Sequence, residues 1–247
     1  MARGFESLSG RAAAIVAAVA LLIPQMGAAQ APAPGGSTAD APTLSPATLA
    51  ILAPARDAIV KAKVRAASLT PAANDRQALL RLRDIDQTAW LAVSHTDFSG
   101  IPLEEKAAAR AYIGDQLEPL DEADVQALLG MLPPEGWFAT SRYGEDGEDA
   151  AYLIIMHGDI DLWRRFAPVI GRFAAAGEAR GSHYALMSDR LAVHEGQPQA
   201  YGSQVACVDG VYKPYPIEDP EHIDERRLKL GMPAYGDYLK TFEGLRC

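Results

Sequence analysis

Apolar residues recur at helical spacing through the first half of this chain, and that period limits the fold more than any other feature. The clearest stretch runs from Asp75 to about Val93. Its apolar stripe consists of Leu79, Leu82, Ile85, Ala89 and Val93. Steps of three and four residues place such side chains on one face of an α-helix. The stripe therefore predicts a long helix with one buried face.

Other segments show the same spacing. Ser45 and Pro46 are typical of an N-cap followed by a first-turn proline, and Pro54 should start or kink the helix that follows. Further helices are predicted over residues 55–67, 103–117, 121–131 and 181–193, with two more over 148–176 that divide near Gly158. Asp159 can cap the second of these two by accepting its first backbone N–H groups.

The period changes late in the chain. Residues 200–208 and 210–215 resemble two strands joined at Asp209-Gly210, which is a favoured hairpin turn. A closing helix is predicted over residues 220–230. The expected fold class is therefore mostly α, within the α+β class, with a small late β-hairpin.

Residues 1–29 have the three parts of a secretory signal peptide. Two arginines precede a wholly apolar run over residues 12–23, and small residues follow at 27–29. As a helix this run would extend about 18 Å, which is too short for a bilayer core of about 30 Å. We therefore expect export to the periplasm or the medium, with no membrane anchor in the mature chain. The alternative is a buried N-terminal helix.

Residues 30–45 are rich in Ala and Pro and are predicted to be a disordered linker. Residues 46–247 then form a single globular domain. The net charge of −9 offers no electrostatic footprint for nucleic acid. The expected partner is an unknown small molecule or a component of the cell envelope, and no nucleic acid.

The chain has two cysteines, Cys207 and Cys247. In an oxidising compartment an even count favours a disulfide. A disulfide that closes the loop from Cys207 to Cys247 would stabilise the fold by about 4 kcal/mol in the chain-entropy model. The alternative is two unpaired thiols.

Several short sequence elements follow one another in a fixed order between residues 136 and 239. They are Gly136-Trp137, Met156-His157-Gly158-Asp159, Asp189-Arg190, the run from Gln199 to Gln204, Pro216-Ile217-Glu218-Asp219, Asp224, Arg226-Arg227 and Leu230-Gly231. This run resembles a bacterial family described only as a domain of unknown function, DUF6624. Asp86-Gln87 resembles an upstream element of the same family. The resemblance implies membership of the family and carries no chemistry with it.

Three residues of these elements are candidate catalytic groups: His157, Asp189 and Arg190. His157 ends an apolar helix, and an imidazole there suits general acid–base chemistry. Alternatively it simply ends the helix. Asp189 and Arg190 are adjacent on one helix, so their side chains diverge by about 100°. Arg190 would bind an anion, unless both residues form ion pairs within the core.

Four residues are candidate substrate-binding groups: Gln199, Tyr201, Gln204 and Asp86. In a strand Gln199 and Tyr201 share a face, and a bulge at Gly202 would bring Gln204 to it. Two amides and a phenol on one face suit a sugar, peptide or amide ligand. Their alternative role is to satisfy the backbone groups of a loop.

Metal and cofactor sites are not predicted. The chain has no His-Glu-x-x-His or Cys-x-x-Cys motif for zinc and no glycine-rich phosphate loop. The His95/Asp97 and His157/Asp159 pairs supply too few ligands by themselves.

Two hypotheses about function remain. In the first, the protein is a hydrolase-like enzyme of the cell envelope, in which His157 is the acid–base group and Asp189 or Asp86 orients it. In the second, it is a non-catalytic binding or scaffolding domain, whose polar cluster holds the hairpin against the helices. Convergence of the side chains on an open cleft favours the enzyme, and burial with internal hydrogen bonds favours the scaffold.

Overall fold

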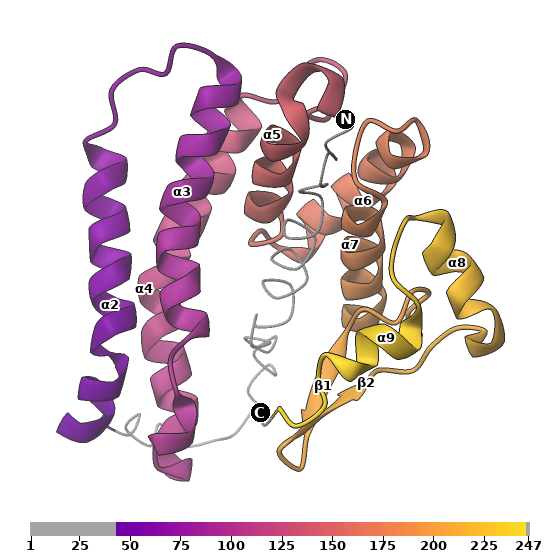
Figure 1. Cartoon of the computed structure of the whole chain (residues 1–247). Coiled ribbons are helices and arrows are strands. Elements are labelled where there is room, and N and C mark those ends of the chain that lie inside the picture. The colour runs from indigo at the N-terminus through magenta and orange to yellow at the C-terminus, as the bar shows by residue number, and fades with distance from the viewer. Residues whose placement is uncertain (1–42, 246–247) are drawn as a thin grey trace, which may run out of the picture. The chain divides into compact units, whose positions relative to one another are not determined.

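The computed structural model describes residues 43–245. The predicted signal peptide and Cys247 lie outside the described residues, as does nearly all of the predicted linker. The described part is mostly helical, as predicted, and has a two-stranded hairpin late in the chain, before its last two helices (Figure 1). Its α-helices are α2 (Pro46–Ala67), α3 (Asp75–Ser94), α4 (Leu103–Gly130), α5 (Thr140–Ile155), α6 (Ile160–Ala175), α7 (Gly181–His194), α8 (Ile223–Lys229) and α9 (Tyr235–Lys240). The strands are β1 (Val205–Val208) and β2 (Val211–Pro214), and 3-10 helices cover Phe98–Gly100 and Pro220–His222.

The chain divides into two compact units, and each has an apolar core of its own. The described part of the first unit comprises residues 43–69 and 85–120, and that of the second comprises residues 70–84 and 121–245. Helices α3 and α4 each supply residues to both units. The prediction of a single globular domain over residues 46–247 stays a prediction.

In the first unit, α2 begins where the sequence predicts a cap. The Ser45 hydroxyl accepts the backbone N–H of Thr48 at 3.2 Å, and Pro46 occupies the first turn. The prediction that Pro54 starts or kinks a helix is wrong in its first form, because α2 runs through this proline. The buried stripe continues on both sides of Pro54, which keeps the helix intact. That stripe consists of Leu52, Ala55, Ile59 and Ala62.

Helix α4 also differs from the prediction. Two helices were expected, over residues 103–117 and 121–131, and the structure has one helix with Pro119 inside it. Pro119 lies on the exposed side, whereas Leu117 and Leu120 are buried. The apolar stripe thus passes the proline without interruption, and its packing outweighs the missing backbone hydrogen bond.

The second unit is built on α5, α6 and α7. Its core is rich in aromatic residues, among them Trp137, Phe138 and Phe166. Helix α5 begins at Thr140, earlier than the predicted Glu148, and Gly144 breaks its regular geometry with a φ of 75°. Asp159 caps α6 as predicted, since its carboxylate accepts the N–H of Leu162 at 2.9 Å.

The hairpin forms at the predicted turn. Asp209 and Gly210 both have positive φ, at 55° and 76°, which matches the twist of an antiparallel pair. Strand β1 begins at Val205 and not at Ala200, because side chains bind the backbone before it, as described below. Helix α9 was not predicted, and Tyr212 of β2 contacts Phe242 just beyond it, with ring centroids 5.5 Å apart. Among the helices described, none combines the length and apolar character that a membrane span requires.

Candidate functional site

His157 lies in the tight turn between α5 and α6. Its backbone N–H donates to the carbonyl of Ile154 at 3.0 Å, which closes the last turn of α5. Two residues later Asp159 caps α6. The imidazole is partly exposed, so solvent can reach it. Two capped helix ends therefore hold this histidine in a defined place.

Arg190 holds the same turn from α7. Its side chain is buried, and Nη1 donates to the carbonyl of Met156 at 3.2 Å. The guanidinium carbon lies 5.4 Å from the centre of the Trp163 ring, in cation–π contact. Burial lowers the pKa of Arg190. These contacts fix the carbonyl next to His157, and the predicted role of Arg190 in binding an anion stays a prediction.

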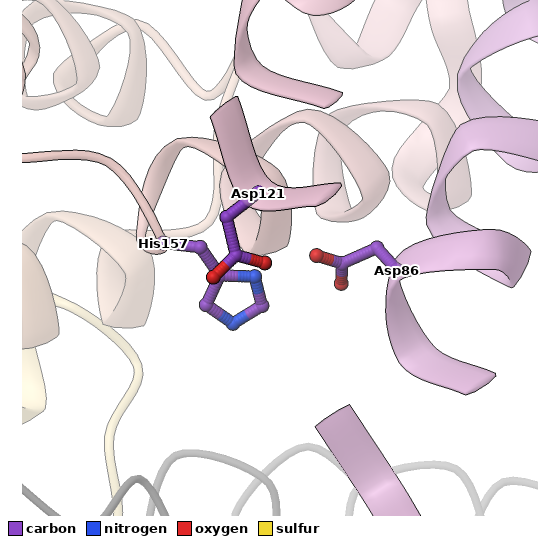
Figure 2. A group of neighbouring side chains, drawn as sticks. All are labelled: Asp86, Asp121 and His157. Atoms are coloured by element: carbon purple, nitrogen blue, oxygen red, sulfur yellow. The ribbon is translucent and has the colours of Figure 1, made fainter. Parts of the chain in front are cut away.

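His157 has two carboxylates near it. Asp86 on α3, Asp121 on α4 and His157 each offer one polar atom, and the three atoms lie within 4.8 Å of one another (Figure 2). Asp86 is buried, whereas Asp121 and His157 are partly exposed. The amide of Gln87 donates to Asp86 Oδ2 at 2.7 Å. We call these three residues the His157 group.

Asp121 is the member that sequence reasoning missed. It stands at the start of the predicted helix 121–131, where an acidic residue is ordinary because it complements the helix dipole. Asp86 and His157 were both predicted, from separate family elements. An imidazole beside two carboxylates is able to transfer a proton or to bind a cation.

The other predicted catalytic residue, Asp189, binds backbone. Its Oδ1 accepts the N–H groups of Ala200 and Tyr201 at 2.8 and 3.0 Å, and Oδ2 accepts that of Ser203 at 2.9 Å. The side chain is fully buried. Burial raises the pKa of Asp189, and the three N–H donors oppose that rise. As predicted from their positions on one helix, the two neighbouring side chains diverge: Asp189 binds the backbone at Ala200, and Arg190 binds the carbonyl of Met156.

The carbonyls of the same segment are also bound by side chains. Arg226 Nε donates to the carbonyl of Ala200 at 2.8 Å, and Arg227 Nη1 to that of Tyr201 at 2.6 Å. The Tyr238 hydroxyl donates to the carbonyl of Ser203 at 2.7 Å. Together with Asp189, these donors fix the backbone of residues 200–203. We call residues 199–204 the bound loop.

Gln199, the first residue of the bound loop, binds the backbone of its last residue, Gln204. Its Nε2 donates to the carbonyls of Gln204 and Tyr215 at 2.9 and 3.1 Å, and its Oε1 accepts the N–H of Gln204 at 2.7 Å. The side chain has no exposed surface. Gln199 therefore performs the alternative role considered for it, which is to satisfy loop backbone groups.

Tyr201 and Gln204 remain partly exposed. The Tyr201 ring lies 6.0 Å from that of Tyr184, and burial, followed by the effect of Tyr184, raises the pKa of Tyr201 to about 12. Gln204 Nε2 donates to the Ser203 hydroxyl at 3.1 Å. Gly202 has the positive φ expected of a bulge, but it lies before β1 and not within a strand. The role of these side chains in binding a substrate stays a prediction.

A second histidine lies in a charged cluster in the core. His183 Nδ1 lies 2.9 Å from Glu148 Oε2, and Nε2 lies 3.3 Å from Asp149 Oδ1. The ring stacks on Tyr152 with centroids 3.8 Å apart. Burial opposes the protonation of His183, but the hydrogen bonds to Asp149 and Glu148 outweigh it, so its pKa is raised. His183 and Glu148 are fully buried, which points to a structural cluster.

Two further features lie outside the His157 group and the bound loop. Cys207 is on β1, and its predicted partner Cys247 is outside the described residues, so the disulfide stays a prediction. A shallow pocket between the hairpin and the residues after α9 is lined by Val205, Tyr212, Phe242 and Leu245 among others. It contains none of the predicted catalytic or substrate-binding residues.

Comparison with known proteins identifies one family. Residues 74–246 match the model of a family described as "Family of unknown function (DUF6624)". The match covers α3 and everything that follows to residue 246, so it extends well upstream of the elements at 136–239 and leaves α2 outside. No curated protein and no solved structure matches the chain.

Proposed function

The chain belongs to the DUF6624 family, whose function is unknown, and from the geometry of its polar residues we propose that it is an exported, hydrolase-like enzyme of the cell envelope. The His157 group is its reactive centre. One observation carries the proposal: Asp86 and His157, from separate family elements, present polar atoms within 4.8 Å of each other and of Asp121. Buried carboxylates beside a reachable imidazole are typical of proton-transfer sites.

The reaction class follows from these side chains. The His157 imidazole accepts a proton from a water molecule, while the water oxygen bonds to the electrophilic carbon of an ester or amide. The bond to the leaving group then breaks, and the imidazolium returns the proton to that group. Asp86 orients the ring and stabilises its positive charge, as an acidic partner does for a catalytic histidine.

The remaining polar residues support this centre. Arg190 is a positioning residue, because it binds the carbonyl of Met156, next to His157. Asp189, Arg226 and Arg227 hold the bound loop, which carries Tyr201 and Gln204. In this proposal those two side chains contact the substrate, since they stay partly exposed on a fixed backbone.

Hydrolysis of chromogenic p-nitrophenyl esters and anilides by the purified exported protein tests the proposal. We expect turnover of at least one of these classes, and a loss of at least about 100-fold in kcat for His157→Gln. His222→Asn is the matched control, because His222 lies 2.9 Å from the carboxylate of Asp219 but is exposed. The control should keep full activity. Absence of turnover, or equal rates for wild type and His157→Gln, would refute the enzyme.

A second candidate function, the non-catalytic scaffold, is favoured by a separate observation. The Asp189 carboxylate and the Gln199 amide are both buried and bind backbone groups of their own chain. If the His157 group had the same structural role as Asp189 and Gln199, His157 would also serve to stabilise the fold. The stability of an Asp86 variant, compared with that of an Asp189 variant, separates the enzyme from the scaffold, as described in the Discussion.

A further inference from the structure

We propose that Asp86, Asp121 and His157 bind one divalent transition-metal ion, with Zn²⁺ as the best-suited ion. The inference rests on the proposed function, because it concerns the same three residues and names the agent that activates the water. It starts from the spacing of their ligand atoms, which all lie within 4.8 Å of one another. Figure 2 shows the Asp86 carboxylate directed toward the other two side chains.

The donor set selects the class of ion. Ca²⁺ and Mg²⁺ prefer oxygen ligands alone, whereas imidazole nitrogen together with carboxylate oxygen suits Zn²⁺ and its neighbours in the first transition row. Three protein ligands leave at least one position for water, as in catalytic zinc sites, whereas structural sites are closed by four protein ligands. The composition of the group therefore favours a reactive metal over a structural one.

The distances require only a small contraction. Zinc bonds to nitrogen and oxygen are about 2.0–2.2 Å long, so bound ligand atoms are roughly 3–4 Å apart. Asp121 and His157 are partly exposed, whereas Asp86 is buried, so in the proposed site the first two side chains move toward the ion. The Gln87 amide, 2.7 Å from Asp86 Oδ2, orients this carboxylate in the way that outer hydrogen bonds orient metal ligands.

A bound cation would also offset the negative charge of the two carboxylates. Two carboxylates that approach each other, one of them buried, repel each other and lose solvation. A divalent ion neutralises both charges. In the metal-bound enzyme His157 is a ligand, and the ion itself acidifies the water that attacks the substrate. The reaction class stays that of the proposed function, while the agent that removes the proton changes.

Titration with Co²⁺ and Zn²⁺ after removal of metals by a chelator tests the inference. Co²⁺ reports its coordination by visible absorption, and calorimetry with Zn²⁺ gives the stoichiometry. We expect one ion per chain and a rise in melting temperature on binding. Binding should weaken at least tenfold in Asp86→Asn, Asp121→Asn and His157→Gln, and stay unchanged in the exposed control His222→Asn. Circular dichroism establishes that each variant is folded.

The outcomes separate this inference from the proposed function. Absence of binding, or binding that the three variants leave unchanged, would overturn the metal site. Hydrolysis that survives chelation in a protein without bound metal would overturn it too, but would leave His157 as the proton acceptor. Stoichiometric binding by the His157 group without any hydrolysis would support the metal site and refute the proposed enzyme.

Discussion

Asp189 Oδ1 accepts the backbone N–H of Ala200 at 2.8 Å. With the N–H groups of Tyr201 and Ser203 on the same carboxylate, this contact shows how one helix of the second unit controls the loop before the hairpin. Arg226 binds the carbonyl of Ala200, so both polar groups of this residue are held by side chains. Side-chain partners, and not secondary structure of its own, hold the backbone of residues 200–203.

Asp189→Asn should destabilise the protein by about 1–3 kcal/mol. An amide can place its oxygen toward Ala200 and Tyr201, but its NH₂ group then faces the N–H of Ser203, and two donors cannot bond. Asp159→Asn is the matched control, because asparagine caps a helix about as well as aspartate and should cost less than about 1 kcal/mol. Urea unfolding curves measure both. Equal, small losses would show that the three N–H contacts contribute little.

Gly202→Ala should destabilise the protein more than Gly196→Ala. Both glycines have positive φ, at 67° and 71°. An added Cβ at Gly202 would meet the Tyr235 ring at 2.6 Å and Ile223 at 2.9 Å, whereas nothing lies within 4 Å of one at Gly196. The left-handed backbone costs each variant about 1–2 kcal/mol, and the overlap adds about 1–3 kcal/mol at Gly202 alone.

Unfolding free energies from urea titration measure this difference. A similar loss in the two glycine variants would mean that the bound loop has space that the structure does not show. In that event the positions of Tyr201 and Gln204 would be less defined than the proposed substrate contacts require.

His183 should titrate above the ordinary histidine pKa of 6.5, as its contacts with Asp149 and Glu148 require. Its folded-state pKa exceeds the unfolded value, so the stability it contributes is fully present below about pH 6.5. That contribution is lost as the pH rises through the folded-state pKa. The stability difference between wild type and His183→Gln should therefore shrink as the pH rises above about 6.5.

NMR titration of the His183 imidazole and unfolding curves across this range are the measurements. His222→Asn is the control: the pKa of His222 is also raised by Asp219, but the side chain is exposed, so its removal should leave the pH dependence nearly unchanged. A pKa for His183 at or below 6.5 would show that burial prevails over the two carboxylates.

Much of the fold follows from local sequence signals. The stripe on α3, the Ser45 cap, the Asp159 cap and the turn at Asp209-Gly210 each depend on residues close together in the chain. These predictions are confirmed for that reason. Pro54 and Pro119 mislead because their local preference is weaker than the buried face that continues past them.

The site follows from the sequence only in part. Helix geometry correctly separates Asp189 from Arg190. Their partners cannot be predicted in this way, because the loop bound by Asp189 and the carbonyl bound by Arg190 come together only through tertiary packing. Asp121 was missed for the same reason: by itself it resembles an ordinary acidic residue at the start of a helix.

In our proposal the polar residues of this chain divide into a supporting frame around Asp189 and a reactive group around His157. Asp86 and Asp189 allow a matched test, because both aspartates are fully buried and both can be changed to asparagine. Asp189 is stabilised by three backbone donors, whereas Asp86 lies near a second carboxylate. Residues that serve function commonly reduce stability.

The deciding measurement is the free energy of unfolding of Asp86→Asn and Asp189→Asn in the presence of a chelator. The account predicts that Asp189→Asn loses about 1–3 kcal/mol, while Asp86→Asn is as stable as the wild type or more stable. A loss for Asp86→Asn as large as that for Asp189→Asn would contradict it, since Asp86 would then belong to the frame.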